Sequence, residues 1–381
     1  MRSCEWRRSG ASCREGREGS GLAVQHEGAH VAVQDLTPPG VNLFSDTQTR
    51  PTPGMRKAIA EAEVGDEQRM MDPTVNALQE RVAELLGKES ALFLPTGSMC
   101  NEIAIRVHIR PGGDELLLHR TAHPIIAEAG GPATLSGAMI HALEGEGGIF
   151  DADTLAAALR PAGDRYQPRS RLVSVEQTTN MGGGRVWPLE TVREVLEVAR
   201  GRGLRTHLDG ARLMNAVVAS GVPAADWASG FDTAWLDFSK GLGAPFGAVL
   251  AGSRELIEEA WRWKQMLGGA LRQAGIIAAA GLYALDHHVD RLAEDHDNAR
   301  VLAEGLAELP GVELEPGKVE TNIVIFEVDD APRLVGELWD RGIEMTPLGP
   351  RRIRAVTHLD VDRAGIERAL SAAGAALGAR V

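Results

Sequence analysis

The sequence predicts an α/β protein in which a mostly parallel sheet is covered by helices on both faces. Short apolar stretches alternate with longer ones in which apolar residues recur at helical spacing, from about residue 73 to about residue 290. The short stretches are apolar throughout, which is typical of strands buried on both faces. The expected strands are residues 91–94, 116–118, 172–176, 205–208, 234–238 and 248–251.

Start signals place the helices between these strands. Asp72 precedes Pro73, a pair typical of an N-cap followed by the first helical residue. Further helices are expected after the turn at residues 97–98 and over residues 189–199. The Ala-rich stretch 274–285 is too short to span a bilayer and is expected to form a buried helix.

The pattern changes after about residue 290, which predicts a second, smaller α+β lobe. Residues 1–40 differ from both lobes, because they are rich in Arg, Gly and Ser and lack the apolar stretch of a signal peptide. We therefore expect three parts: a disordered extension over 1–40, a large lobe with an N-terminal arm over 41–290, and a small lobe over 291–381. The small lobe is expected to contain helix 291–309, strand 322–328, helix 334–341, strand 353–356 and a final helix.

The composition argues against several classes of function. The chain has 381 residues, 44% of them hydrophobic and 24% charged, as in ordinary globular proteins. A net charge of −13 and an aromatic content of 4% argue against a nucleic-acid binder. Because no apolar run is long enough to cross a bilayer, we expect no membrane partner.

The spacing of the cysteines and the positions of three histidines bear on the cellular compartment and on metal binding. None of the three cysteines has the spacing of a metal or redox motif, so we expect a reducing compartment, the cytoplasm. His287, His288 and His296 lie among acids and are interpreted as part of a solvated helix face, so no metal is expected.

Three elements carry residues suited to one chemistry. An expected strand ends at Asp209, which can keep a ring nitrogen protonated, and Arg212 follows where it can hold a carboxylate. A second strand leads to Lys240 in a glycine-rich turn, a position suited to bonding an aldehyde. The turn at Gly97 and Ser98 begins a helix whose N–H groups suit a phosphate. Together the three elements predict a site for pyridoxal phosphate (PLP).

The sequence also resembles a known family, the low-specificity threonine aldolases, in the β-eliminating lyase group of fold-type I PLP enzymes. The resemblance runs from about Asn42 to nearly the C-terminus and implies the aspartate aminotransferase-like fold. The matching motifs are Phe44-Ser45-Asp46-Thr47-Gln48-Thr49-Arg50-Pro51, Glu63-Val64-Gly65-Asp66, Asp72-Pro73-Thr74-Val75-Asn76, Ala122-His123 with Glu128-Ala129-Gly130-Gly131, Gly182-Gly183-Gly184, His207-Leu208-Asp209-Gly210-Ala211-Arg212, Ser239-Lys240-Gly241-Leu242-Gly243, Gly268-Gly269 with Arg272-Gln273-Ala274-Gly275, and Arg354 with Val356-Thr357-His358-Leu359-Asp360.

The resemblance implies a homotetramer with active sites at subunit interfaces, and it implies roles for individual residues. These are Lys240 for the covalent bond to PLP, Asp209 for the pyridine nitrogen, His123 for stacking on the ring near the reacting hydroxyl, Gly97 and Ser98 for the phosphate, Arg272 for the phosphate of a neighbouring subunit, and Ser45, Arg212 and Arg354 for the substrate carboxylate, with Arg212 also counted among the cofactor-binding residues.

The sequence departs from the family pattern at two places. Thr179 stands where the family has a histidine near the substrate hydroxyl, so the base is either His123 or an ordered water held by Thr179. Arg69 replaces a tyrosine of the family and adds a cation where substrate side chains are expected. Arg69 would favour a negatively charged side chain, as in a hydroxyaspartate.

The expected reaction is retro-aldol cleavage of a β-hydroxy-α-amino acid of the threonine or allo-threonine type to glycine and an aldehyde. Three alternatives stay open: another PLP reaction such as β-elimination or transamination, an aldolase for another substrate such as phenylserine or hydroxyaspartate, and a non-catalytic PLP- or phosphate-binding protein. The cofactor is PLP in every case except a protein that binds phosphate alone.

Overall fold

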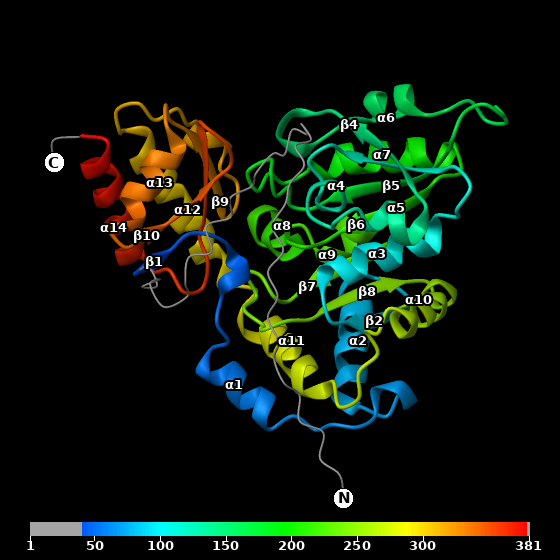
Figure 1. The fold of residues 1–381 in the computed structure, drawn as a ribbon. Helices are drawn as coiled ribbons and strands as arrows, with labels where there is room; N and C mark the ends of the chain where they lie inside the picture. Colours follow the sequence, from blue (N-terminus) through cyan, green and yellow to red (C-terminus); the bar gives the residue numbers. More distant parts are fainter. Residues whose placement is uncertain (1–39, 379–381) are drawn as a thin grey trace, which may run out of the picture. The chain divides into compact units, whose positions relative to one another are not determined.

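The structure is a computed structural model that describes residues 40–378. Its larger sheet has seven strands in the order β2-β8-β7-β6-β5-β3-β4 (Figure 1). Strands β3 to β7 pair in parallel, whereas β8 runs antiparallel to both β7 and β2. The strands are β2 Ser90–Leu94, β3 Asp114–His119, β4 Met139–Leu143, β5 Arg169–Glu176, β6 Arg205–Asp209, β7 Thr233–Asp237 and β8 Ala248–Gly252.

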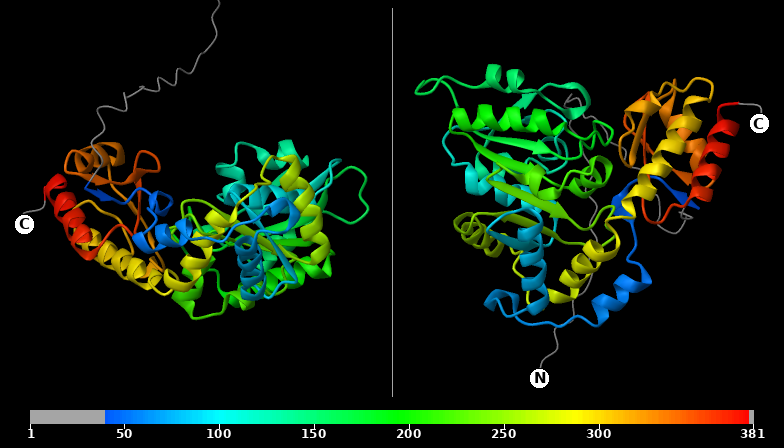
Figure 2. Two further views of the ribbon diagram at one scale, coloured as in Figure 1. Left: turned by 90° about the horizontal axis from the view of Figure 1, so that it is seen from below. Right: turned by 180° about the vertical axis from the view of Figure 1, so that it is seen from behind.

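Successive residues of the central strands pack into cores on opposite faces of this sheet. Leu117 lies in one core, with α7, whereas its neighbours Leu116 and Leu118 lie in another core on the opposite face. Trp235 lies in the core that contains α3, whereas Leu236 lies in the core that contains α7. The period of two is that of an extended strand covered on both faces, and helices lie on both faces (Figure 2).

The helices that surround the large sheet include the four predicted from the sequence, which begin at Pro73, Gly97, Leu189 and Gly275, and others that were not predicted. They are α1 Pro53–Ala60, α2 Pro73–Leu85, α3 Gly97–His108, α4 His123–Ile126, α5 Gly131–Ser136, α6 Ala152–Ala158, α7 Leu189–Gly201, α8 Leu213–Ser220, α9 Ala224–Ala228, α10 Arg254–Met266 and α11 Gly275–His287. The Ala-rich stretch is α11, whose Ala278, Ala280 and Ala284 are buried. No helix among residues 40–378 is long and apolar enough to cross a membrane.

A second core forms around a three-stranded antiparallel sheet in the order β11-β12-β9. Its elements are α12 Leu292–Ala307, β9 Ile323–Glu327, α13 Ala331–Trp339, β11 Thr346–Pro347, β12 Arg352–Val356 and α14 Arg363–Ala376. Strand β1 (Val41–Asn42) pairs in parallel with β10 (Ile343–Glu344), and Val41 and Leu43 are buried in this second core. The residues directly after 40 therefore pack with the C-terminal part, which differs from the predicted large lobe over 41–290.

Elements that the sequence analysis missed have weak local signals. The edge strand β4 was not predicted, because Met139 and Ile140 are exposed and the strand lacks a buried apolar run. Strands β1, β10 and β11 contain two residues each, too few to show a periodicity. The predicted extension over residues 1–40 lies, except for Gly40, outside the described residues.

The carboxylate of Asp72 joins the start of α2 to two other segments. Its Oδ1 accepts from the backbone N–H groups of Thr74 and Val75, at 3.1 and 3.0 Å. Its Oδ2 accepts from Gly65 N at 3.1 Å and Gly275 N at 2.9 Å. Asp72 is fully buried, so one side chain satisfies four backbone donors of three segments.

We expect the Asp72→Ala variant to lose about 3 kcal/mol of unfolding free energy, because buried N–H groups beyond an ordinary helix cap lose their acceptor. Urea unfolding followed by circular dichroism measures this loss. The matched control is Asp151→Ala, since Asp151 caps α6 from the surface through Thr154 N alone. Equal losses in the two variants would show that the contacts to Gly65 and Gly275 contribute nothing.

Candidate active site

Three carboxylates stand at the carboxyl ends of three adjacent parallel strands. Glu176 ends β5, Asp209 ends β6 and Asp237 ends β7, and Glu176 and Asp209 are register partners. Asp237 pairs with Ala248 of β8, which pairs with Leu94 of β2. Because β8 is antiparallel to both neighbours, the end of β2 lies at the same edge of the sheet. Ligands of open α/β sheets bind outside this edge.

Lys240 follows β7 and is held near this edge. Its Nζ lies 3.2 Å from Asp237 Oδ2 and 5.7 Å from the centroid of the Trp235 ring. Its backbone oxygen accepts from Thr49 Oγ1 at 3.0 Å. The side chain is 16% exposed, so the amine is largely removed from water yet can be reached.

Helix α3 begins beside the same indole ring. Thr96 caps the helix by accepting from Met99 N. A Cβ on Gly97 would lie 2.4 Å from a Trp235 ring atom, so only glycine fits here. The N–H groups of Gly97 and Ser98 belong to the first turn, where they have no partner within the helix. The predicted phosphate donors and Lys240 thus lie around one tryptophan.

Asp209 is buried and held by an asparagine that the sequence analysis did not single out. Its Oδ1 accepts from Ala211 N at 3.0 Å and its Oδ2 from Asn101 Nδ2 at 2.8 Å. Asn101 Oδ1 in turn accepts from Trp235 Nε1 at 2.8 Å, and it lies 3.2 Å from His207 Nε2. Asn101 therefore connects the predicted partner of the pyridine nitrogen to the tryptophan beside Lys240.

His123 is fixed at both its backbone and its ring. Its N–H donates to Glu176 Oε2 at 2.8 Å, and its Nδ1 donates to Glu128 Oε1 at 2.7 Å. The hydrogen bond to Glu128 raises the pKa of His123, with smaller contributions from the charges of Asp209 and Glu128, against burial and Lys240, which lower it. Glu176 is a second residue that the sequence analysis missed, although its place at a strand end is the same signal that identified Asp209.

Arg212 has a buried partner that was not predicted. Its Nε and one terminal nitrogen donate to the two oxygens of Asp46, at 2.8 and 2.6 Å. Burial raises the pKa of Asp46, but the charge and hydrogen bond of Arg212 outweigh burial and hold this pKa at about 2. The bidentate face expected to hold a substrate carboxylate is therefore occupied by Asp46. Ser45 is buried next to it and accepts from Thr47 N at 3.2 Å.

Arg354 of β12 reaches the site from the smaller sheet. One terminal nitrogen donates to Asn180 Oδ1 at 3.0 Å, and Asn180 N donates to Glu176 Oε1 at 2.7 Å. The Nε of Arg354 is buried and has no acceptor among residues 40–378. Burial, and after it the charge of Arg212, lowers the pKa of Arg354. Two neighbouring guanidinium groups with an unpaired N–H suit an anion.

The structure places Thr179 in a buried turn. Its Oγ1 donates to Gly147 O at 2.8 Å, and its backbone bridges to Arg185. A Cβ on Gly182 would lie 2.4 Å from Oγ1, so this glycine is needed for the turn to close over the hydroxyl. The proton of the hydroxyl is donated to the backbone, and the oxygen can act toward other groups only as an acceptor.

Arg69 and Arg272 are not brought to Lys240 within this chain. Both side chains are exposed, and Arg272 lies 3.4 Å from Asp66. Their segments are joined, because Glu67 N donates to Arg272 O at 2.9 Å and the Glu67 carboxylate pairs with the buried Lys264. The two arginines therefore stand on one anchored surface.

The histidines interpreted as a solvated helix face are located differently. His288 is buried and its Nδ1 donates to Leu242 O at 2.7 Å, so that interpretation is wrong for His288. His287 ends α11, whereas His296 lies on α12, 3.2 Å from Asn215 Nδ2. Among residues 40–378 no group of three His, Cys, Asp or Glu side chains has an arrangement that could hold a metal ion.

With this geometry established, comparison with known proteins decides the family. The model of the beta-eliminating lyase family matches residues 42–331. This chain belongs to the beta-eliminating lyase family. Over 338 residues it is 39% identical to low-specificity L-threonine aldolase 1 of Arabidopsis thaliana, a match that covers 87% of this chain and 94% of the relative. It is 41% identical over 325 residues to the low specificity L-threonine aldolase of Escherichia coli K12, with 85% and 95% covered.

Solved structures share the fold of this beta-eliminating lyase. The threonine aldolase of Leishmania major superposes with a TM-score of 0.77 at 18% identity, over 88% of this chain and 99% of that one. Serine palmitoyltransferase of Sphingomonas wittichii gives 0.67 at 20% identity, over 88% of each chain. Together with the family match, these likenesses confirm the resemblance stated from the motifs, the fold class and the assignment to PLP-dependent lyases.

The residues present fit PLP. The cofactor presents an aldehyde, a pyridinium and a phosphate, which require an amine, a carboxylate and N–H donors. Lys240 and the start of α3 meet around Trp235, and Asn101 links Trp235 to Asp209. The donor set of the chain thus matches all three groups of the cofactor.

We expect the Asp46→Asn variant to be about 3 kcal/mol less stable at neutral pH, because it leaves Arg212 buried without a counter-charge. The pKa of Asp46 lies below its ordinary value of 3.8 in the folded protein, at about 2. Its stabilising contribution is therefore present above about pH 4 and is lost as the pH falls through 2. The difference between wild type and variant is expected to narrow by about 1 kcal/mol between pH 6 and pH 3.

Denaturant unfolding at these two pH values measures the change. Asp297→Asn is the matched control, since Asp297 pairs with Arg300 on the surface and both side chains are more than half exposed. A difference that is the same at pH 6 and pH 3 would contradict the assigned ionisation of Asp46.

Proposed function

We propose that this protein is a PLP-dependent aldolase that cleaves β-hydroxy-α-amino acids of the threonine type to glycine and an aldehyde. The observation that carries this proposal is the position of Lys240. Its amine lies 3.2 Å from Asp237 and next to Trp235. At the same edge of the sheet, β6 ends at Asp209 and α3 begins. The relatives named threonine aldolase, similar over nearly their whole length, support the same reaction.

Bound PLP supplies an electron sink for the electron pair of the broken Cα–Cβ bond. In this proposal Lys240 bonds the cofactor, and the N–H groups of Gly97 and Ser98 donate to its phosphate. The carboxylate of Asp209 keeps the pyridine nitrogen protonated, while Asn101 and Ala211 hold the two oxygens of that carboxylate in place. His123, fixed by Glu128 and Glu176, stacks on the ring.

The substrate carboxylate is proposed to bind at Arg354, whose buried Nε has no acceptor within the described chain. Arg212 stands beside it with two nitrogens bonded to Asp46, so it contributes charge and its remaining terminal nitrogen. Ser45 completes the pocket as a buried neighbour of Asp46. Fixing the carboxylate fixes the orientation of the bond to be broken.

The base for the β-hydroxyl proton is proposed to be an ordered water that donates to Thr179. Because Thr179 gives its own proton to Gly147 O, its oxygen accepts from the water. A lone pair of that water is then free to take the proton of the substrate. His123 is a poorer base, since its Nδ1 donates to Glu128 and a stacked ring is poorly aimed for proton transfer.

The remaining proposals concern assembly, location and substrate range. We propose a homotetramer in which Arg272 reaches the phosphate of a neighbouring site and Arg69 contacts the substrate side chain there. The exposed and jointly anchored positions of both residues support this arrangement. Exposed Met70, Met71 and Met266 give the same surface an apolar character. The free buried thiol of Cys100 is compatible with the cytoplasm.

We expect purified protein with PLP to release glycine and an aldehyde from threonine, allo-threonine, phenylserine and hydroxyaspartate. Aldehyde release measured with a coupled dehydrogenase, together with amino-acid analysis, tests this expectation. Release of ammonia and a keto acid instead would identify β-elimination. If Arg69 contacts the substrate, hydroxyaspartate will be cleaved faster than threonine; no such gain removes Arg69 from the site.

The Lys240→Ala variant is expected to lose the visible absorbance of the bonded cofactor, and borohydride reduction should no longer attach a cofactor-derived group to the peptide that contains residue 240. Lys318→Ala is the matched control, because Lys318 is exposed and, among residues 40–378, pairs only with Glu146 and Glu315. It should retain both signals. An unchanged spectrum of the Lys240→Ala variant would refute the assignment of Lys240.

The Thr179→Val variant is expected to lower kcat about tenfold with little change in KM, because valine has the shape of threonine but accepts no hydrogen bond from the water. Thr179→Ser, which restores the oxygen, should recover most of the rate. Steady-state kinetics of the two variants with threonine measure both effects. If the valine variant keeps full activity, Thr179 has only a structural role.

A further inference from the structure

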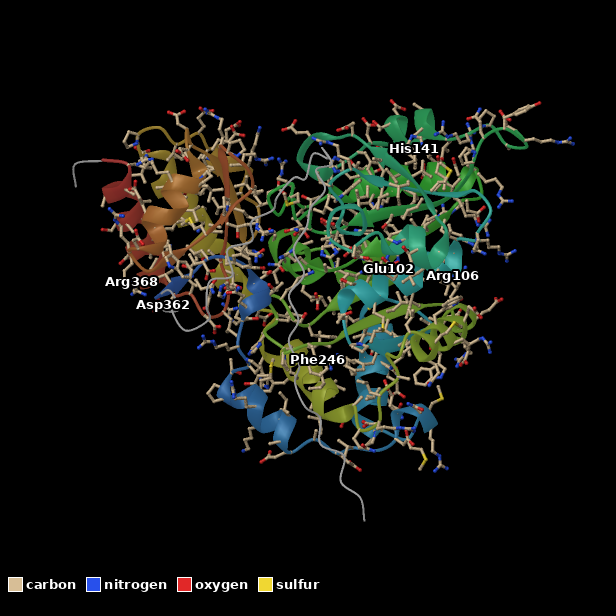
Figure 3. The ribbon with its side chains drawn as sticks, in the orientation of Figure 1. Glu102, Arg106, His141, Phe246, Asp362 and Arg368 are labelled. Carbon is tan, nitrogen blue, oxygen red and sulfur yellow. The ribbon has the colours of Figure 1, made fainter. Side chains whose placement is uncertain are left out.

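A carboxylic acid outside the proposed catalytic set adjoins the partner of His123. Glu102 lies on α3, directly after Asn101 in the sequence, and is labelled in Figure 3. Glu102 is 7% exposed, and neither of its carboxyl oxygens has an N–H or O–H donor within residues 40–378. Its side chain is within hydrogen-bonding distance of Glu128. An ionised carboxyl group that is buried without a cation or a hydrogen-bond donor is unfavourable, so such a group takes up a proton.

Glu128 uses one oxygen for the site and leaves the other for Glu102. Its Oε1 accepts from His123 Nδ1 at 2.7 Å and from Asn101 Nδ2 at 2.8 Å. Its Oε2 is buried and, like both oxygens of Glu102, has no donor among the described residues. Two carboxylates in contact repel each other, whereas one proton between them forms an O–H···O bond. A single proton on Glu102 therefore satisfies Oε2 and leaves Glu128 ionised.

The backbone confines Glu102 to this position. A Cβ on Gly131 would lie 2.0 Å from Glu102 Oε1, so the start of α5 closes directly over the carboxyl group. Gly131 N donates to Glu128 O at 2.8 Å, which ties the segment that covers Glu102 to the segment that carries its partner. The carboxyl oxygens of Glu102 are thus buried beneath the start of α5.

We propose that Glu102 is a protonated positioning residue, whose carboxyl O–H donates to Glu128 and so fixes the opposite oxygen of Glu128 on the imidazole of His123. Burial, and after it the hydrogen bond and charge of Glu128, raises the pKa of Glu102 to about 9, in agreement with this geometry. The proposal rests on the proposed function only for the consequence that a fixed imidazole stacks on the cofactor. The protonation itself is independent of the reaction.

The charged groups that face His123 come from four different parts of the fold. They are Glu128 after α4, Glu176 of β5, Asp209 of β6 and Lys240 after β7. A neutral Glu102 adds no charge to this set, whereas an ionised Glu102 would add one. Replacing Glu102 with the neutral glutamine therefore separates the two states.

Difference infrared spectroscopy of the full-length holoenzyme at pH 8 tests the protonation. We expect wild type to show a carboxylic acid C=O band that shifts in D₂O, is absent in Glu102→Gln and persists in Glu115→Gln. Glu115 is the matched control, because it is buried but faces Arg160 and Ser170. If the Glu102→Gln variant keeps every carboxylic acid band of the wild type, the proposal is overturned, whether or not the protein cleaves amino acids.

The titration of His123, followed by NMR of labelled histidine in the same holoenzyme, tests the positioning. Glu102→Gln should leave the pKa of His123 unchanged, because an amide N–H still donates to Glu128. Glu102→Leu should raise it by about half a unit to one unit, because more negative charge remains on the oxygen that faces His123. The pH profile of kcat/KM should move with it in the leucine variant only.

These outcomes also distinguish the proposal from an inert buried group. A fall of the His123 pKa by about one unit in Glu102→Gln would show that Glu102 is ionised and would overturn the proposal. An unchanged His123 in a folded Glu102→Leu variant would reduce Glu102 to a packing residue. If the leucine variant does not fold, the infrared band and the glutamine titration still decide.

Discussion

Buried carboxylates must find donors, and this constraint organises the site. Glu176, Asp209 and Asp237 end adjacent parallel strands, where the pairing of the sheet stops, and Asp209 and Asp237 are buried while Glu176 is partly buried. Each meets a group to which the proposed reaction assigns a fixed place. Glu176 holds the backbone of His123, Asp209 binds Asn101, and Asp237 lies against Lys240.

Asn101 shows how one side chain coordinates several of these groups. Its amide donates to Asp209 and Glu128, and its oxygen accepts from Trp235. An aspartate at this position would have no N–H to give to the two carboxylates, and a leucine would leave Asp209 Oδ2 and Trp235 Nε1 without this partner. His123, Asp209 and the tryptophan beside Lys240 are therefore oriented together.

Residues with a strong local signal could be predicted from the sequence, whereas their long-range partners could not. Asp209 and Lys240 follow apolar strands, and Gly97 starts a capped helix, so each was located by its own neighbourhood. Asp46 is 166 residues from Arg212 and Asn101 is 108 from Asp209, and nothing near either residue in the sequence indicates the contact. The βα alternation predicted a mostly parallel sheet, but it did not predict the edge strand β4, which lacks a buried apolar run, or the reversed direction of β8.

The smaller sheet contributes to the site through charge as well as contact. Arg354 is anchored to Asn180, and through it to Glu176, while Asn322 of the segment before β9 donates to Asp46, the partner of Arg212. Two guanidinium groups held close together repel each other, and burial strengthens the repulsion because water screens it less. A carboxylate between them relieves this repulsion and meets the unpaired Nε of Arg354. In the proposed function this repulsion contributes to the affinity for a substrate carboxylate, and we expect a change in the packing of the smaller sheet to alter binding even where it touches no substrate atom.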